Sequence, residues 1–455
     1  MKKILLSLMS LLAMPPITHA QRVNIGDVIY EVNGEEATVA YSWDAAGDIS
    51  ILPEVEIEGE MYPVTSISYG AFGAHVKGHR EYIVAITSVD IPSSVVSIDD
   101  NAFTKSTLTE ITVPETVKKI GNYVFKGCTD LRKAVIEGGK DSLGMELFNE
   151  CIALESAVIG EGHTVVPEYT FAGCKALSDV ELPSSLKEIK GSAELGGAFI
   201  FCSSLQTIDL PEGLTSIGIM GFHGSGLTSI VLPESLTNIG ESAFSGCYYL
   251  ESAKLPSSLE VLPKSMFRHC RSLESITIPA SVTVIEGGEY NEGCFDHCSS
   301  LKHVTLSKNL KEIKGYAFNA CSIDSIVIPE TVTEIGYKAF CPVKDIEMRY
   351  VKCFAKEPPV LGESVFFESE MPSGLEVFIP ESSLELYRNA DVWKDFFLTG
   401  FDATSSVVPT AVASDDHWTV YGLDGHLVLD TYDYFSLSSL VPGFYIINGK
   451  KQIVR

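Results

Sequence analysis

Hydrophobic residues recur along the chain in one pattern, with a period of about 22 or 23 residues. The clearest copy, residues 227–249, reads LTSIVLPESLTNIGESAFSGCYY. In its first part, L-x-x-I-x-L-P, apolar and polar residues alternate as they do in a short strand with one buried face. The proline ends that strand because it has no backbone N–H to donate to a ladder. The pattern therefore predicts one short strand at the start of each copy.

The rest of each copy supplies further apolar positions. The stretch S-L-x-x-I-G adds two of them, and its glycine lets the backbone turn. The stretch A-F-x-G-C then places alanine, phenylalanine and cysteine where they pack inward before the next leucine. A single copy cannot bury these side chains alone, whereas stacked copies bury them as continuous columns. At least about three copies are therefore needed for a stable fold.

About twelve copies follow one another. Earlier copies run over residues 64–72 and 86–103, and the copies at 177–204 and 273–300 are longer by about five or six residues. At about 150 residues per domain, the length of 455 residues would suggest three domains. The internal repeats instead predict one solenoid. The clear copies begin at Leu108, Leu131, Leu154, Leu177, Leu205, Leu227, Leu250, Leu273, Leu301 and Ile323.

The run of LPxSLxxIGxxAFxGC units resembles the leucine-rich repeats of the BspA-like family of bacterial cell-surface proteins. The resemblance covers roughly residues 64–401. It implies an α/β-type repeat solenoid with mostly short parallel strands, an irregular or short helical convex side, and a right-handed arc. The chain departs from the common leucine-rich consensus, because proline follows the strand where that consensus has Asn or Cys.

Five parts are predicted along the chain. Residues 1–20 are predicted to be a secretory signal peptide, because Lys2 and Lys3 precede an apolar stretch that ends in small residues. A buried N-terminal helix is the alternative interpretation. Residues 21–63 are predicted to form a β-hairpin cap around the Asn33-Gly34 turn. Residues 64–402 are then predicted to hold the leucine-rich repeat solenoid with its C-terminal cap.

The last two parts are a linker and a small β-rich C-terminal module. Residues 403–416 are small, polar and Pro-containing, as in a linker. Residues 417–455 carry hairpin signals at Asp424-Gly425 and Asn448-Gly449. This module resembles small C-terminal β modules that sort exported proteins in bacteria with a dedicated secretion system. A module with a purely structural role is the alternative.

The apolar stretches and the charge of the sequence limit where the protein can be located and which partners it can bind. No Cys follows the predicted cleavage before Gln21, and no other stretch approaches the ~18 apolar residues of a membrane span. We therefore expect a secreted or cell-surface protein without a transmembrane span. Asp and Glu number 60 against 33 Lys and Arg, which argues against a nucleic-acid partner. Loss of Lys2 and Lys3 would change the net charge from −27 to −29.

Most of the eleven cysteines share one repeat position. We expect them to be reduced, buried thiols, because free Cys packs as a small hydrophobe. Cys294, Cys341 and Cys353 lie elsewhere in the repeat. A zinc site at Cys294 and Cys298 is a weak alternative, since no second pair of ligands follows at the proper spacing. The cysteines of the column are Cys128, Cys151, Cys174, Cys202, Cys247, Cys270, Cys298 and Cys321.

No catalytic, cofactor-binding or metal site is predicted, and we expect no enzyme. His75 and His79 form H-x-x-x-H, but the glycines beside them favour a solvated loop over a metal-binding helix. The S-x-x-K matches at 184–187 and 299–302 come from Ser-rich turns, in two different phases of the repeat. The sequence contains no G-x-S-x-G elbow, P-loop or Rossmann fingerprint.

The two non-buried positions of each strand point away from the core, and stacking aligns them into one long face. Such a face can accept a protein partner, and its acidic group Asp179, Glu181 and Asp209 favours basic segments. A solvated face that serves only solubility is the alternative. The candidate ligand face comprises Glu110, Thr112, Asp179, Glu181, Thr207, Asp209, Ser229, Val231, Lys254, Thr277, His303 and Thr305.

The family resemblance implies an exported, surface-associated binding or adhesion protein that recognises extracellular protein through its solenoid. The alternatives are an extracellular glycan-binding accessory protein and a structural envelope component. The near absence of aromatic residues from the predicted face disfavours the glycan-binding alternative. The loops at Gly196-Gly197 and 287–291 are a second candidate site, because loops on a rigid scaffold often carry function.

Overall fold

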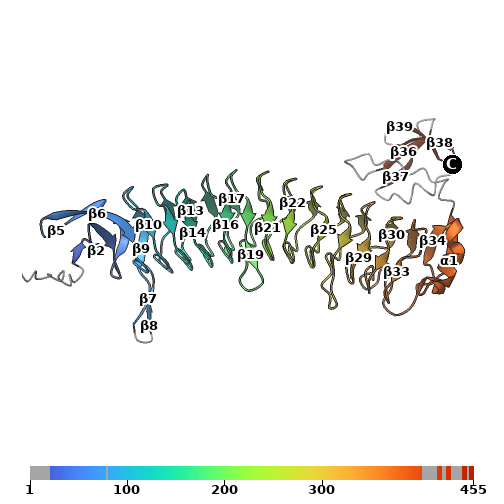
Figure 1. The fold of residues 1–455 in the computed structure, drawn as a ribbon, viewed down its shortest axis with the longest axis horizontal. Helices are drawn as coiled ribbons and strands as arrows, with labels where there is room; N and C mark the ends of the chain where they lie inside the picture. The colour runs from blue at the N-terminus through green and yellow to red at the C-terminus, as the bar shows by residue number, and fades with distance from the viewer. Residues whose placement is uncertain are drawn as a thin grey trace, which may run out of the picture. The chain divides into compact units, whose positions relative to one another are not determined.

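The computed structural model describes residues 21–77, 80–401, 418–422, 427–431, 443–447 and 450–454. The chain divides into two compact units, Met1–His163 with Tyr169–Pro183 and Thr164–Glu168 with Ser184–Arg455. In each unit, short parallel strands from successive turns form a β-solenoid with very little helix (Figure 1). The predicted signal peptide, the linker and the two predicted C-terminal turns lie outside the described residues.

The predicted first strand of each copy forms in the first unit. The strands pair in parallel, with Ile111 opposite Ala134 and Ala134 opposite Ala157. Along the first of them, exposed Glu110 and Thr112 alternate with buried Ile111 and Val113, as the period of two predicts. The four strands of this sheet are β11 (Glu110–Val113), β13 (Lys133–Ile136), β15 (Ser156–Ile159) and β17 (Asp179–Glu181).

The second unit repeats this arrangement in three sheets. β22 (Ser229–Val231) pairs with β24 (Ser252–Lys254), and β26 (Ser275–Thr277) pairs with β28 (His303–Thr305). The third sheet continues to the end of the array. It comprises β30 (Ser325–Ile328), β32 (Tyr350–Cys353), β34 (Glu376–Pro380) and β35 (Leu398–Phe401).

Each turn also contains a second strand that the sequence pattern did not predict. The S-L-x-x-I-G stretch forms two-residue strands, and these pair in parallel from turn to turn, for example Ile189 with Ile217. In the first unit these strands are β10 (Ser97–Ile98), β12 (Lys119–Ile120) and β14 (Ser142–Leu143). In the second unit they are β16 (Val165–Val166), β18 (Glu188–Ile189), β21 (Ser216–Ile217), β23 (Asn238–Ile239), β25 (Val261–Leu262), β27 (Val284–Ile285), β29 (Glu312–Ile313), β31 (Glu334–Ile335) and β33 (Val360–Leu361).

The third side of each turn is irregular. Residues 21–77 and 80–380 contain no helix, so the irregular form of the predicted convex side applies to them and the helical form does not. The residue two positions after the repeat phenylalanine adopts a left-handed conformation, with φ of 70° at Gly127 and 73° at Gly246. Glycine is favoured there because it has no Cβ to clash. His297 occupies the same position with φ of 60°.

A column of stacked phenylalanines forms the centre of each unit. The rings lie nearly parallel, with centroids 5.3–5.6 Å apart in the first unit and 5.0–6.2 Å apart in the second. An aromatic pair contributes about 0.5–1.5 kcal/mol beyond its buried area. The column residues are Phe72, Phe103, Phe125, Phe148 and Phe171 in the first unit and Phe199, Phe222, Phe244, Phe267, Phe295, Phe318, Phe340 and Phe366 in the second.

The N-terminal segment adds strands to the first sheets of the array. β2 (Val28–Asn33) and β3 (Glu36–Val39) pair antiparallel across the Asn33-Gly34 turn. β3 then pairs in parallel with the following long strand, β6 (Glu60–Ile67). The other strands are β1 (Arg22–Ile25), β4 (Ala46–Ser50), β5 (Glu54–Ile57), β6 (Glu60–Ile67), β7 (His75–Lys77), β8 (Arg80–Tyr82) and β9 (Ala85–Asp90).

Helical residues gather at the end of the array. A 3-10 turn, Glu381–Ser383, leads into α1 (Leu384–Asn389), and a second 3-10 turn spans Trp393–Asp395. The Trp393 indole donates a hydrogen bond of 2.7 Å to the Pro359 carbonyl, so this segment contacts the preceding turn. Further along the chain, an antiparallel sheet consists of β36 (Trp418–Gly422), β37 (Leu427–Thr431), β38 (Gly443–Ile447) and β39 (Lys450–Val454).

Candidate functional site

The outward strand positions form most of the exposed face that the sequence pattern predicts. The copy that begins at Leu205 is the exception, because residues 205–210 form no strand, so Thr207 and Asp209 do not lie on a strand. Every residue of the candidate ligand face has an exposed side chain, from Glu110 and Thr112 to His303 and Thr305. The register of the parallel strands places Ser229 opposite Ser252 and Thr277 opposite Thr305. Their side chains therefore stand in rows across neighbouring turns. Whether this face holds a ligand stays a prediction.

The acidic group of the face is divided between the two units. Asp179 and Glu181 lie on β17 in the first unit, and both are exposed. Asp209 is also exposed, but it belongs to the second unit and lies outside the strands. The three carboxylates therefore remain a predicted group.

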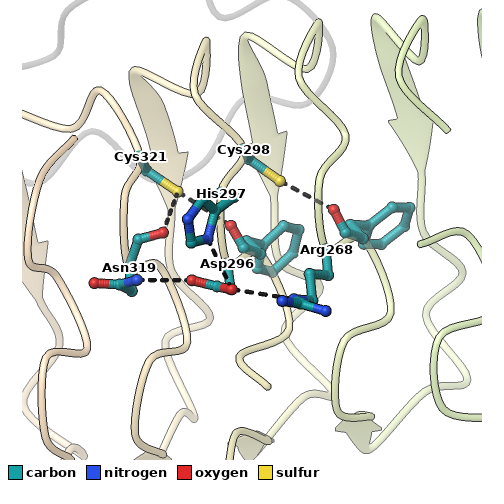
Figure 2. Close-up of polar contacts among 8 residues, drawn as sticks. Arg268, Asp296, His297, Cys298, Asn319 and Cys321 are labelled. Atoms are coloured by element: carbon teal, nitrogen blue, oxygen red, sulfur yellow. Dashed lines mark hydrogen bonds and ion pairs between the residues drawn. The ribbon is translucent and has the colours of Figure 1, made fainter. Parts of the chain in front are cut away.

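The sequence did not reveal a buried ionic cluster in the second unit (Figure 2). The Asp296 carboxylate is fully buried and has three partners. It accepts hydrogen bonds from Arg268 Nε at 3.2 Å and from Asn319 Nδ2 at 2.7 Å, and it lies 2.9 Å from His297 Nδ1. A buried carboxylate without such partners would cost several kcal/mol. The cluster therefore ties three successive turns together.

The position of these residues in the repeat explains how the cluster forms. Arg268, Asp296 and Asn319 each follow the column phenylalanine of their turn, so stacking brings them side by side. A related cluster occurs in the first unit. There the Glu146 carboxylate lies 2.6 Å from Lys126 Nζ and accepts a hydrogen bond from Asn149 at 2.7 Å. An alignment of the copies that scored charged residues within two positions of the column phenylalanine could have found both clusters.

Histidines lie beside the Asp296 cluster. The His269 and His297 rings are 4.9 Å apart. Burial and the nearby Arg268 guanidinium lower the pKa of His269 below its usual value. The same two causes lower the pKa of His223. In the part of the chain that the structure describes, no group of three His, Cys, Asp or Glu side chains could hold a metal ion.

The cysteine column is buried, as the repeat predicts, and all eleven cysteines are buried. The thiols donate to the carbonyl of the phenylalanine in the preceding turn, at 3.1 Å for Cys298 to Phe267 and 3.3 Å for Cys270 to Phe244. Burial raises the pKa of Cys247 to about 11. Such thiols are poor metal ligands and nucleophiles at neutral pH, because the thiolate is the reactive form.

Two serines replace cysteine in this column. Ser106 Oγ lies 3.4 Å from Cys128 Sγ, and Ser225 Oγ lies 3.3 Å from Cys247 Sγ. Both serines are buried. The column therefore accepts a small hydrogen-bonding residue of either kind.

His75 corrects one expectation, because its ring belongs to a stack of aromatic side chains. It lies on β7 in the first unit, 4.2 Å from the Trp43 ring and 5.3 Å from the Tyr82 ring, and nearly parallel to both. Hydrophobic packing, which the flanking glycines did not suggest, thus holds the imidazole. Trp43 and Tyr82 remain partly exposed. His79 lies outside the described residues.

The long copies place their extra residues between the second strand and the column phenylalanine. In one, β19 (Gly191–Ser192) and β20 (Gly196–Gly197) pair antiparallel as a small hairpin. In the other, the loop at 287–293 carries Tyr290, whose side chain is 81% exposed. Both project from the same side of the second unit (Figure 1). The prediction that these loops bind a ligand stays open.

The repeat geometry agrees with a known family. The sequence matches the family model described as BspA type leucine rich repeat region (6 copies), over residues 81–193, 196–288 and 287–347. These matches cover more than half of the chain. The chain belongs to this BspA-type leucine-rich repeat family. The resemblance read from the LPxSLxxIGxxAFxGC units is thereby confirmed.

Solved structures of other leucine-rich repeat proteins are similar to this BspA-type chain. One, a leucine-rich repeat protein from Bacteroides ovatus, is 23% identical over 78% of this chain and 70% of its own, with a TM-score of 0.40. A leucine rich cell surface protein from Faecalibacterium prausnitzii is 25% identical over 66% of this chain and 92% of its own, with a TM-score of 0.37. No curated protein matches the sequence. None of the helices among the described residues is long and apolar enough to cross a membrane.

Proposed function

We propose that this protein is an exported, surface-associated binding protein that recognises an extracellular protein through its outward strand face. The observation that carries the proposal is the row of exposed side chains that parallel pairing aligns, such as Thr277 with Thr305. Membership of a repeat family agrees with a recognition scaffold, because solenoids present extended binding surfaces. Export through residues 1–20 and sorting through residues 417–455 are parts of the same proposal.

Aromatic and basic side chains at the edge of this face suit a protein partner. Tyr249 lies in the turn that precedes β24, and its side chain is 64% exposed. The Arg271 guanidinium lies 4.9 Å from the centre of the neighbouring Tyr248 ring. Tyrosine and arginine are enriched among the residues that dominate binding energy at protein interfaces. We therefore expect Tyr249 and Arg271 to be the anchors of the interface.

The test is binding of purified residues 21–455 to immobilised extracellular-matrix proteins and to intact bacterial cells. We expect saturable binding to at least one of them, weakened at least about tenfold by Tyr249→Ala or Arg271→Ala. Tyr69→Ala is the matched control, because it removes another exposed tyrosine from a turn that belongs to neither candidate site. No saturable binding to any target, or equal losses from the control, would contradict the proposal.

The acidic part of the face needs its own variants. Reversal of Asp179 and Glu181 to Lys tests the first unit, and Asp209→Lys tests the second. If the partner contributes basic segments, each variant should weaken binding, and added salt should weaken it further. Unchanged binding in both variants would remove these carboxylates from the proposed interface.

A second candidate function is glycan binding, and the stack of Trp43, His75 and Tyr82 favours it. Partly exposed aromatic rings such as Trp43, at 45% exposure, suit contact with a sugar ring. A screen of the purified protein against soluble and insoluble polysaccharides tests this candidate. Binding that is lost in Trp43→Ala and kept in Tyr249→Ala would favour it over protein recognition. Binding to no polysaccharide would exclude it.

A further inference from the structure

The outward face changes in character at the end of the second unit. On β32 the outward residues are Tyr350 and Lys352, and on β34 they are the exposed Glu376 and Phe378, whereas β26 carries Ser275 and Thr277. Phe354 and Phe401 lie beside Tyr350, Lys352 and Phe378, and all five of these side chains are partly exposed. We call these five residues the Lys352 patch.

Aromatic rings surround the lysine of this patch. Lys352 Nζ lies 4.6 Å from the centre of the Phe401 ring and 5.1 Å from that of Phe354. These two rings meet edge to face with centroids 5.1 Å apart. Lys352 is opposite Phe378 in the strand register, and the Phe378 ring lies 5.0 Å from that of Tyr350. The ammonium group therefore lies close to two aromatic rings on the strand face.

Lys352 differs from the other described lysines in its surroundings. Burial lowers its pKa, and no carboxylate contributes to that shift. Lys314, Lys338 and Lys394 instead have raised pKa values because each contacts a carboxylate. Within the described residues Lys352 makes no ion pair. A partly buried cation without a counter-ion is unfavourable, so an anion placed beside it would be stabilised.

We propose that the Lys352 patch is a binding site for an acidic peptide segment, in which one carboxylate pairs with Lys352 and adjacent apolar side chains pack on Tyr350 and Phe378. Charge complementarity selects the carboxylate, and the ring-lined border selects the apolar neighbours. This site is separate from the anchors proposed near β24, so either proposal can fail alone.

Other anionic ligands fit the patch less well. A phosphate group prefers several donors or a bidentate arginine, whereas Lys352 presents one ammonium group. An anionic membrane attracts clusters of basic residues, whereas this chain carries a net charge of −27. A single carboxylate flanked by apolar groups matches the single cation and its aromatic border.

The test uses fluorescence polarisation with the full chain and the labelled peptide acetyl-Gly-Phe-Asp-Phe-Gly-amide. We expect saturable binding, weakened at least about fivefold when the peptide aspartate is replaced by asparagine, because the charge pair is lost. Lys352→Met should weaken binding at least about tenfold, and Lys352→Arg should keep most of it. Lys308→Met, in an exposed turn of the second unit, is the matched control and should bind as the wild type does.

The Lys352→Met protein should unfold at the wild-type denaturant concentration or above, because methionine fills a similar volume without burying a charge. Absence of saturable peptide binding overturns the proposal. So does equal binding by Lys352→Met or by the asparagine peptide, since either shows that the charge pair is not formed. Binding of inorganic phosphate or of phosphatidylserine vesicles that depends on Lys352, without peptide binding, also overturns it.

Discussion

The interior columns and the outward strand face of the second unit follow different rules. The phenylalanine column keeps the same residue in every turn from Phe199 to Phe366. The outward face instead changes from Thr277 and Thr305 on β26 and β28 to Lys352 and Phe378 on β32 and β34. The difference shows that an interior that is the same in every turn supports an outward surface whose residues change from turn to turn. Stability belongs to the columns, and we assign recognition to the face.

The largest effect is expected from Phe267→Ala in the column. Phe267 is fully buried and stacks on Phe244 and Phe295 at 5.5 Å and 5.4 Å. Its truncation should lower the free energy of unfolding by about 3–5 kcal/mol, because it leaves a cavity and removes two ring contacts. Urea unfolding followed by circular dichroism measures the change. A loss below about 1 kcal/mol would show that the column does not carry stability.

A smaller loss is expected from Asp296→Ala. Removal of this carboxylate leaves Arg268 and His297 without their common partner, although both reach solvent in part. We expect a loss of about 2 kcal/mol, less than the usual 3–5 kcal/mol for breaking a fully buried pair. Asp296→Asn should lose about half as much, because its amide oxygen still accepts one hydrogen bond. Equal losses in both variants would show that packing, and not the ionic contacts, is responsible.

Two histidines that lie outside the strands are expected to make the stability of the second unit depend on pH. His223 and His269 have folded pKa values below the usual one, so the unfolded chain binds more protons. Well above a pH of about 6.5 the two histidines make their whole contribution to stability. This contribution decreases as the pH falls below that value. Urea midpoints between pH 5 and 8 should therefore decrease toward acid. The decrease should be smaller in the double variant His223→Gln with His269→Gln. If the double variant shows the same decrease as the wild type, these histidines do not cause it.

A cysteine substitution tests how strict the columns are. Cys247→Ser should cost about 1 kcal/mol or less, since its neighbour Ser225 already occupies the same column position. The serine hydroxyl can donate to the Phe222 carbonyl as the thiol does at 3.2 Å. Cys247→Leu is the contrasting variant and should cost more through overpacking. Equal unfolding midpoints for both would mean that this column is loosely packed.

The smallest effect is expected on the outward face. Thr277→Lys places a charge on an exposed position of β26 and should change the free energy of unfolding by no more than about 0.5 kcal/mol. The same urea experiment provides the measurement, with Ile276→Lys as the buried counterpart on the same strand. A large loss at Thr277 would contradict the assignment of stability to the interior alone.

The sequence predicted the repeat core well. The L-x-x-I-x-L-P pattern correctly predicted strands such as β11 and β26, and the cysteine position correctly predicted a buried column. It missed the second sheet, because two-residue strands such as Ile189 with Ile217 have no alternation long enough to recognise. The hairpin cap, the linker and the C-terminal module stay predictions.

The candidate sites were predicted less completely than the core. The alternation of apolar and polar residues predicted that the strand face is exposed. It did not predict the Asp296 cluster, the His75 stack or the Lys352 patch. Each of these sites joins residues that are more than twenty positions apart in the sequence. Arg268 and Asp296, for example, are separated by 28 positions. Their contacts depend on the register between turns and on side-chain directions, which no local pattern contains.

The sequence by itself determined that this chain forms a leucine-rich repeat solenoid with phenylalanine and cysteine columns. The physical reason is that apolar residues repeated at one period can all be buried together only when successive turns stack. Only the tertiary structure decided which polar and aromatic side chains meet across the turns. Hydrogen bonds and ring contacts need atoms within a few ångströms and a set geometry, so the stacked backbone had to exist before Asp296 or Lys352 acquired partners.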